Sequence, residues 1–359
     1  MNIAYFAPIP YDFLMQRPQY LAKELSKRYN VYYVEPTISA IQKVLRGEET
    51  FKARQKDISD RLHIVRMDGL FAIPRILKAY DLFGISNVWE RRQLRKTIPE
   101  PEIIWVGYCG WYPVSSYFSG IHVYDKMDDN SLLARNVLLS KQLAAYDKLL
   151  LRKAASIFVA ASNLYEEALS VNPQSYLIPN AVDVEFAKIV VSSKKADNKR
   201  VFGYIGMIDD WFDLIAVRTI VDASKDNEVV LVGPNNIPEI HHARVKYMGR
   251  LPKEELPAII SSFDVCLYPF RQNQLLETIN PIKIYEYLAL NKPILAVDSR
   301  EIRAFGELVW RYKTYEELKN LCSERFPEPF VTEDARLQFI SNNNWEKRGL
   351  IMMDVLEAL

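Results

Sequence analysis

The stretch N-P-I-K-I-Y-E-Y-L-A-L-N-K-P-I-L-A-V, residues 280–297, predicts a helix followed by a short buried strand. Asn280 is a suitable N-cap, and Pro281 suits the first helical position, where its missing N–H costs nothing. Asn291 tolerates the left-handed conformation that ends helices, and the proline two positions later prevents continuation. The last four residues are apolar, as expected of a strand in a parallel sheet. This order of elements belongs to an α/β fold.

Two charged residues of this helix suggest a ligand. Lys283 falls in the first turn, where a cation is unfavourable beside the positive end of the helix dipole. An anion held there by the free N–H groups and the ammonium would relieve the conflict. Glu286 lies on the same face, about one turn deeper. A nucleoside diphosphate matches this pair, with phosphate at the lysine and ribose hydroxyls at the glutamate. The alternative is a solvated Lys–Glu pair on a surface helix.

Length and composition indicate a globular protein of two domains. The chain has 359 residues, enough for two hydrophobic cores, and its net charge of +1 gives no reason to expect a nucleic-acid partner. The cysteines at positions 109, 266 and 322 are widely spaced among apolar residues, as is typical of reduced core residues. No signal peptide or apolar run of about 20 residues is present. We therefore expect a cytoplasmic protein, peripheral to the inner face of the cell membrane at most.

Two β-α-β series predict two doubly wound, Rossmann-like domains. The first series has strands at residues 2–8 and 31–34, with a helix opened by Arg17 between them. Ligands of such domains gather outside the carboxyl ends of the strands. No G-x-G-x-x-G follows the first strand, which argues against a classical dinucleotide site. The polar stretch 188–200 is the best linker, after which the second series begins.

These signals predict the domain boundaries. We expect an N-terminal domain at residues 1–187, a C-terminal domain at 200–335, and a helix at 336–359 that packs back on the first domain. Residues 38–100 are basic, aromatic and irregular, and we interpret them as an insertion. Within it, residues 71–96 combine aromatic side chains with arginines and lysines, which is compatible with peripheral membrane contact. A helical pair covering the sheet, with arginine stems packed on apolar surface, explains the pattern equally well.

Two adjacent carboxylates, Asp128 and Asp129, follow the strand predicted at residues 121–125. They stand at the carboxyl end of that strand, where ligand-binding residues of such a domain are expected. Their alternative role is capping of a helix beginning near Ser131. Capping explains Asp129 as well as a functional role does, and explains Asp128 less well.

Several short motifs, in order along the chain, resemble the GT-B glycosyltransferases. They are I-P-N-A-V-D (178–183), V-K-Y-M-G-R-L-P-K-E-E-L (245–256) and F-D-V-C-L-Y-P-F (263–270). Further motifs resemble one branch, which includes the teichuronic acid biosynthesis transferases and the xanthan-type glucuronosyltransferase. These are N-P-x-K-x-x-E-Y (280–287), Q-R-P-Q-Y-L (16–21), Y-D-K-M-D-D (124–129) and G-Y-I-G-M-I-D-D-W-F-D (203–213). The likeness covers most of the chain apart from residues 38–100.

The resemblance implies two Rossmann-like domains facing a cleft, with the nucleotide sugar bound by the second. Lys283 would bind the diphosphate and Glu286 the ribose diol. The other residues implied on the donor side are Asn280 and Pro281 at the helix tip, and the backbone of Gly206, Met207 and Ile208. Tyr268 and Pro269 would help to frame the base, although strand-end packing explains them equally well.

The implied reaction moves a sugar from a nucleoside-diphosphate sugar, with UDP favoured, to a saccharide or lipid-linked saccharide in polysaccharide biosynthesis. Asp128 would be the general base if the enzyme inverts the anomeric carbon, and Asp12 is the alternative base. Tyr11, Arg17 and Asp129 would lie nearby on the acceptor side.

Departures from the family pattern bear on the mechanism. Many retaining relatives have a glutamate eight positions before the one equivalent to Glu286, but this chain has Thr278 there, with Glu277 one residue out of register. The loop 206–212 also lacks the Arg and Lys that those relatives use against phosphate. Inversion is therefore favoured. No D-x-D motif is present, and we expect neither a metal nor another cofactor.

Two other functions share this architecture. A sugar-nucleotide 2-epimerase needs several acid/base residues, and none of the four histidines lies beside a motif quoted above. A non-catalytic protein that binds a nucleotide sugar, or serves as a scaffold, would also keep Lys283 and Glu286.

Overall fold

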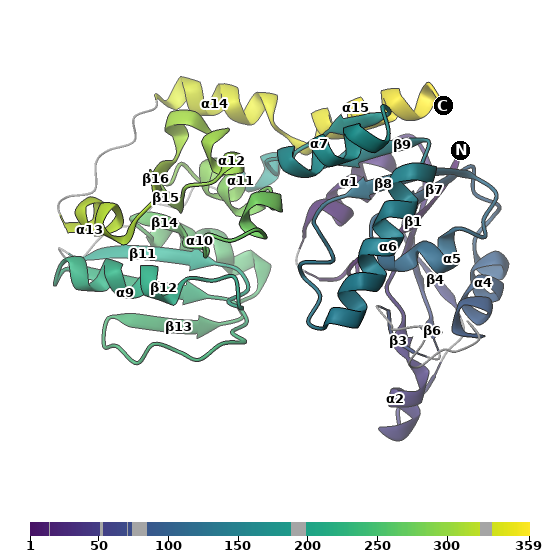
Figure 1. Cartoon of the computed structure of the whole chain (residues 1–359), viewed down its shortest axis with the longest axis horizontal. Helices are drawn as coiled ribbons and strands as arrows, with labels where there is room; N and C mark the ends of the chain where they lie inside the picture. Colours follow the sequence, from purple (N-terminus) through teal and green to yellow (C-terminus); the bar gives the residue numbers. More distant parts are fainter. Residues whose placement is uncertain (14, 51–52, 70, 74–84, 188–198, 324–331) are drawn as a thin grey trace. The chain divides into compact units, whose positions relative to one another are not determined.

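The computed structural model describes residues 1–13, 15–50, 53–69, 71–73, 85–187, 199–323 and 332–359. The chain forms two compact units (Figure 1). Unit 1 consists of residues 1–179 and 345–359, and unit 2 of residues 180–344. Both are α/β with a predominantly parallel sheet, which confirms the predicted fold class. Residues 180–187, expected in the first domain, belong to unit 2, and most of the predicted linker, 188–198, lies outside the described residues.

Unit 1 is built on an eight-stranded sheet in the order β10-β9-β8-β7-β1-β2-β5-β4. All neighbours are parallel except the edge pair β4–β5. The central strands are buried along most of their length, which explains their continuous apolar sequences. The strands are β1 (Asn2–Phe6), β2 (Asn30–Val34), β4 (Arg54–Ser59), β5 (Leu62–Arg66), β7 (Ile103–Val106), β8 (Ile121–Lys126), β9 (Ser156–Val159) and β10 (Ser175–Leu177).

Residues 38–100 were interpreted from the sequence as an insertion. Two strands from this range, β4 and β5, belong to the main sheet of unit 1. β5 pairs in parallel with β2 because Leu62, Ile64 and Val65 are buried there, and β4 extends the sheet as an exposed edge strand. A two-stranded ribbon, β3 (Ile38–Ser39) and β6 (Asp68–Gly69), accompanies them.

The helices of unit 1 lie around this sheet, apart from the one at Ala40–Leu45, which has no buried residue and projects away from it (Figure 1). They are α1 (Arg17–Leu25), α2 (Ala40–Leu45), α4 (Ile85–Thr97), α5 (Tyr112–Ser115), α6 (Val137–Lys153), α7 (Ser162–Val171) and α15 (Trp345–Glu357), with the 3₁₀ turn η1 (Cys109–Trp111). α15 packs against α1, where the rings of Trp345 and Tyr20 stack with centroids 4.9 Å apart. The expected return of the C-terminal helix to the first domain is thereby confirmed. The tail is two helices, however, because the chain leaves helical geometry at Asn343 after α14 (Glu333–Asn342) in unit 2.

Unit 2 contains a six-stranded parallel sheet in the order β13-β12-β11-β14-β15-β16. The strands are β11 (Arg200–Ile205), β12 (Asn227–Val232), β13 (Val245–Gly249), β14 (Val265–Tyr268), β15 (Ile294–Val297) and β16 (Trp310–Tyr312). The remaining elements are α8 (Val184–Ala187), α9 (Leu214–Ala223), η2 (Lys253–Glu255), α10 (Leu256–Ser262), η3 (Leu276–Thr278), α11 (Ile282–Ala289), α12 (Arg300–Arg303), η4 (Gly306–Leu308) and α13 (Tyr315–Ser323).

The strand order of unit 2 reverses at β11, with β12 on one side and β14 on the other. Because parallel crossovers are right-handed, α9 covers one face of the sheet while α10 and α11 cover the other. Such a reversal separates the loops at the carboxyl ends of the two central strands and is the usual place for a ligand in this architecture.

Gly203, at the centre of β11, supports the packing of this sheet. A Cβ at this position would lie 2.0 Å from Cδ2 of Phe263, whose ring is buried. We expect Gly203→Ala to lower the free energy of unfolding by about 1–3 kcal/mol, because the ring must shift within a packed core. Urea unfolding of purified protein measures this, and Gly203→Ala/Phe263→Leu should recover part of the loss. An unchanged midpoint for the single variant would contradict the packing argument.

Candidate functional site

α11 ends as its sequence predicts. Leu290 is the C-cap, and Asn291 follows in the left-handed region with φ of 53°. The N–H of Asn291 donates to the carbonyl of Leu288 at 3.1 Å, and the N–H of Lys292 donates to the carbonyl of Tyr287 at 3.1 Å. This pair of bonds is the Schellman motif, which satisfies the last carbonyl groups of the helix.

The start of α11 differs from the prediction, because Asn280 is not its N-cap. Pro281 occupies that position and offers no side-chain cap. The buried side chain of Asn280 instead accepts a hydrogen bond from the N–H of Asn180 at 2.9 Å and donates to Glu301 at 2.6 Å. With Asn280 engaged elsewhere, no N-cap side chain bonds the first turn of α11. The N–H of Ile284 donates to the carbonyl of Pro281 at 3.1 Å, which leaves the N–H groups of Ile282 and Lys283 without an acceptor in the helix.

Lys283 and Glu286 lie on one face of α11, as predicted. Nζ of Lys283 lies 2.8 Å from Oε2 of Glu286, and their side chains are 22% and 16% exposed. The ammonium and the carboxylate are thus partly withdrawn from water beside an uncapped helix end. The structure shows the pair in contact, which leaves both the ligand-binding interpretation and the ion-pair alternative consistent with the geometry.

Backbone hydrogen bonds fix the position of the loop that follows β11. The N–H groups of Gly206 and Ile208 each donate at 2.9 Å to carbonyl groups of residues 232–234, and the carbonyl of Met207 accepts from the Tyr204 hydroxyl at 3.0 Å. Ile208 is fully buried, whereas the side chain of Met207 is exposed. Of these three residues, Met207 therefore has the side chain that a ligand could contact.

Tyr268 and Pro269 at the end of β14 are explained by packing. Tyr268 is buried and stacks on Phe270 with ring centroids 4.1 Å apart. The carbonyl of Pro269 accepts a hydrogen bond from the N–H of Asp213 at 2.8 Å. In this structure the Tyr268 ring does not present a surface to a base, and the alternative of strand-end packing accounts for both residues.

Asp128 in unit 1 has the electrostatic character of a base. It follows β8 and is partly buried. Burial, and the nearby carboxylates of Asp125 and Asp129, raise the pKa of Asp128 to about 6, against the opposing effect of Arg17. Bases work best when their pKa lies near the operating pH, so this carboxylate is better suited to proton abstraction than an ordinary aspartate.

Asp129 has a local structural role. Its Oδ1 accepts hydrogen bonds from the N–H and the hydroxyl of Ser131, at 2.9 and 2.6 Å. The helix expected near Ser131 begins only at Val137, where Asn136 caps it through a 2.8 Å bond from the N–H of Leu139. Asp129 therefore caps a turn, and the predicted start of the helix was wrong because a better N-cap lies seven residues later.

Arg17 is buried rather than open to an acceptor. Its side chain is 3% exposed, with Nη2 2.7 Å and Nε 3.0 Å from Oδ1 of Asp125, and Nη1 donates to the carbonyl of Ile178 at 2.7 Å. The proposed acceptor role is thus corrected to a structural one. Asp125 belongs to the motif Y-D-K-M-D-D, but no role was predicted for it. An acidic residue inside a strand that is largely apolar could have indicated it, because a buried carboxylate requires a cationic partner.

Breaking the Arg17–Asp125 pair is expected to be costly. We expect Arg17→Met to lower the free energy of unfolding by about 3–5 kcal/mol, because Asp125 would remain buried and unpaired. The Arg17→Met/Asp125→Leu variant removes both charges and should lose much less. Urea unfolding of the two variants checks this, and an equal loss in both would refute the ion-pair explanation.

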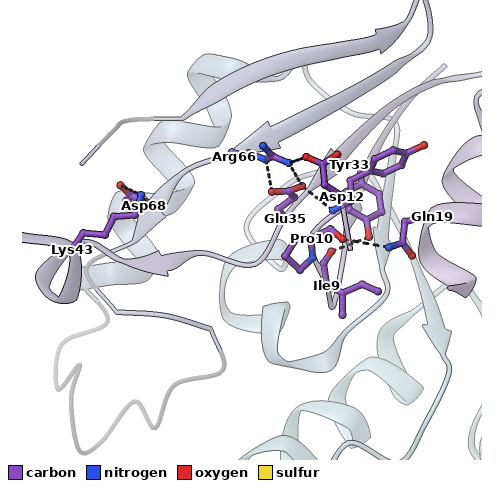
Figure 2. A network of polar contacts seen from close by, with 10 residues as sticks. Ile9, Pro10, Asp12, Gln19, Tyr33, Glu35, Lys43, Arg66 and Asp68 are labelled. Carbon is purple, nitrogen blue, oxygen red and sulfur yellow. Dashed lines mark hydrogen bonds and ion pairs between the residues drawn. The ribbon is translucent and has the colours of Figure 1, made fainter. Parts of the chain in front are cut away.

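Asp12 is engaged in an ion-pair network of unit 1, which Figure 2 shows. Arg66 lies between two carboxylates, with Nη2 2.5 Å from Oδ2 of Asp12 and Nε 2.6 Å from Oε2 of Glu35. The hydrogen bond from Arg66 lowers the pKa of Asp12. Glu35 also accepts from the N–H of Tyr11 at 2.8 Å, and the Tyr11 ring meets Tyr33 edge-on. This network favours Asp128 over Asp12 as the base.

The arginines of α4 bear on the expected membrane contact. Arg91 donates to the carbonyl of Pro113, and Arg95 donates to the carbonyl of Tyr117 at 3.1 Å. Both contacts fit the alternative in which arginines pack on unit 1, while Arg92 and Lys96 remain exposed. Residues 74–84 of the predicted 71–96 stretch lie outside the described residues. No helix in the described part of the chain is long and apolar enough to cross a bilayer.

Comparison with known proteins identifies part of unit 2. Residues 199–312, from the start of β11 to the end of β16, match the family described as Glycosyl transferases group 1. The match covers about a third of the chain and lies wholly within unit 2. Lys283, Glu286 and the Gly206 loop all fall within the matched residues, whereas Asp12 and Asp128 lie in unit 1.

One curated relative is TuaH of Bacillus subtilis strain 168, whose name describes a teichuronic acid biosynthesis glycosyltransferase. It is 22% identical over 221 residues, which cover 54% of this chain and 55% of that protein. The match thus spans about half the length of that relative.

Solved structures show that the whole chain has the GT-B fold. Sucrose-phosphate synthase from Thermosynechococcus elongatus is similar with a TM-score of 0.72 and 15% identity, over 99% of this chain and 98% of that one. HepE of Anabaena, solved with UDP and glucose, has a TM-score of 0.68 and 11% identity, over 100% of this chain and 99% of that one. An E. coli trehalose-6-phosphate protein bound with UDP-2-fluoro glucose has a TM-score of 0.71 and 11% identity over the same shares. At 11–15% identity these structures show the likeness of the fold alone.

Proposed function

We propose that the protein transfers a sugar from a nucleoside-diphosphate sugar, with UDP favoured, to a hydroxyl group of a saccharide or lipid-linked saccharide in polysaccharide biosynthesis. The observation that carries the proposal is the uncapped first turn of α11 with Lys283 and Glu286 beside it, within the residues that match the group 1 family. The choice of nucleotide is supported by two GT-B neighbours, one solved with UDP and the other with a UDP-sugar derivative.

The donor would be held by charge and hydrogen bonds of α11. The N–H groups of Ile282 and Lys283 and the ammonium of Lys283 face the diphosphate, while Glu286 accepts hydrogen bonds from the ribose hydroxyls. The Lys283–Glu286 contact keeps both side chains oriented before the donor arrives. In this proposal no metal ion is required, since the phosphate charge is met by the lysine and the helix end. Full activity after treatment with EDTA is the expected result.

Asp128 would activate the acceptor for inversion at the anomeric carbon. Glycosyl transfer passes through an oxocarbenium-like state, in which a base removes the acceptor proton as the diphosphate departs. One GT-B neighbour, a trehalose-6-phosphate synthase, is described as transferring its sugar with retention. At the position that retaining relatives fill with glutamate, Thr278 donates its hydroxyl to the carbonyl of Leu275 at 2.8 Å. The absence of a carboxylate at this position supports inversion.

Glu286→Ala is expected to weaken donor binding without a large change in kcat. Loss of a charge-assisted hydrogen bond to the ribose should raise the Kd for UDP about 10- to 100-fold, from a net contribution of about 1.5–3 kcal/mol. Isothermal titration of UDP measures this, and Glu307→Ala, an exposed glutamate of η4, is the matched control. Unaltered UDP affinity in Glu286→Ala would remove the ribose assignment.

Product analysis tests the proposed function directly. The full chain is incubated with UDP-sugars and saccharide acceptors, and the products are analysed for a new glycoside and for its anomeric configuration. A new glycoside of inverted configuration supports the proposal. A 2-epimerised donor would indicate the epimerase alternative, and UDP binding without any product would indicate a non-catalytic nucleotide-sugar-binding protein.

A further inference from the structure

Unit 2 has two adjoining hollows at the carboxyl edge of its sheet, and both are lined by Lys313. The larger, of about 520 Å³, lies between the first residues of α9 and α13 and is lined in part by Arg271, Lys313 and Tyr315. The second, of about 390 Å³, shares Lys313 and adds Arg303 and Arg311. α9 and α13 pack against each other, and α9 covers the face of the sheet opposite to α11. Neither hollow is lined by a residue of α11.

The carboxylates that line these hollows already have partners. Asp213 caps α9 by accepting from the N–H of Ile215 at 2.9 Å, and it accepts from the Tyr315 hydroxyl at 2.9 Å. Asp298 accepts two hydrogen bonds from Nε of Arg303, both at 3.1 Å. In the same way, Glu317 accepts from the N–H of Lys313 at 2.7 Å. The negative charge in the hollows is thus engaged by the fold itself.

Two basic side chains at the hollows form no ion pair with the described carboxylates. The side chains of Arg271 and Lys313 are exposed, and no ion pair to either is found among the described residues. Their backbones are fixed, since the N–H of Arg271 donates to Trp211 at 2.8 Å and Gln272 donates to the carbonyl of Lys313 at 3.3 Å. A guanidinium and an ammonium are therefore held at one rim with their hydrogen-bond donors available.

We propose that the two hollows form one binding site for an acidic saccharide, whose carboxylate or phosphate groups are bound by Arg271 and Lys313. Arginine binds such oxyanions with two parallel hydrogen bonds, and lysine adds a point charge. Each volume falls in the range of about 300–1,000 Å³ that small organic ligands occupy, which is more than a lone phosphate ion needs. The exposed ring of Tyr315 and the exposed Ile215 supply apolar surface for a sugar ring. This site goes beyond the proposed transfer reaction and does not depend on it.

Titration of the full chain with three probes tests the site. Trigalacturonate carries the proposed chemistry, maltotriose is the neutral saccharide, and inorganic phosphate is the oxyanion alone. We expect trigalacturonate to bind measurably more tightly than either other probe, with an affinity that falls as salt increases. Arg271→Ala/Lys313→Ala should weaken this binding by at least about tenfold, whereas Lys319→Ala, an exposed lysine of α13, should leave it unchanged.

Several results would overturn the proposal. They are no binding of trigalacturonate, equal binding of maltotriose, binding of phosphate as tight as that of trigalacturonate, and unchanged affinity in the double variant. UDP titration of the same double variant should match the unaltered protein, because neither substituted residue belongs to α11. This measurement shows that the variant is folded and separates failure of this site from failure of the donor site.

Discussion

Asp128→Asn is expected to lower kcat by about 10²–10⁴, the contribution of a positioned base. The amide keeps the size of the side chain but cannot accept the proton of the acceptor hydroxyl. Initial rates with saturating donor and acceptor measure the loss. UDP affinity should be unchanged, because Asp128 lies in unit 1 and the proposed donor site in unit 2. An Asp128→Asn enzyme with normal turnover would reject the assignment of the base.

The pH dependence offers an independent check on the same residue. The base must be ionised, and the pKa of Asp128 is about 6, so kcat/KM should decline as the pH falls through about 6. Asp129→Asn keeps an oxygen that can accept from Ser131 but removes a negative charge that raises the pKa of Asp128. This variant should stay active, with its acid limb moved to lower pH. A limb that moves to higher pH would contradict the electrostatic argument.

Lys283→Ala is expected to lower kcat by about 10²–10³, as removal of a preorganised charge-stabilising group does at other anion sites. The ammonium would stabilise the charge that develops on the departing diphosphate, together with the N–H groups of the first turn of α11. Initial rates with a UDP-sugar measure the effect. Lys283→Arg keeps the positive charge and should retain more activity than Lys283→Ala.

A matched control separates this role from general loss of positive charge. Lys225 is an exposed lysine in the turn before β12, at the opposite, amino edge of the same sheet. Lys225→Ala should leave kcat unchanged, since no phosphate is expected at the amino ends of parallel strands. If Lys283→Ala and Lys225→Ala behave alike, α11 does not bind the leaving group, and the ion pair with Glu286 is only structural.

Short-range features could be predicted well from the sequence. The left-handed end of α11 at Asn291 and the placement of Lys283 and Glu286 on one helical face both depend on residues within a few positions of each other. Helical spacing and residue conformation determine such features without reference to the rest of the chain. The charged face of α11 could therefore be predicted from the sequence, whereas the residues that cap the helix could not.

Long-range features were decided by the tertiary structure. Asn280 was expected to cap α11, but its side chain binds Asn180, 100 residues earlier, and Glu301, 21 residues later. Arg17 was expected at the acceptor, yet it is buried against Asp125, 108 residues away. Neither partner can be inferred from local sequence, because a polar side chain that becomes buried takes whichever partner the fold brings within reach.

The two carboxylates after β8 illustrate both cases. Asp129 bonds Ser131 two residues away, so its local role could be predicted from the sequence, although the helix expected there begins only at Val137. The raised pKa of Asp128 arises chiefly from burial, which only the folded protein supplies, and in smaller part from Asp125 and Asp129, its neighbours in the sequence. The sequence by itself determined the α/β units, the charged face of α11 and the presence of an acidic pair. Only the tertiary structure decided which carboxylate has a raised pKa and which arginine is buried. Desolvation and pairing between distant residues arise only when distant segments pack together.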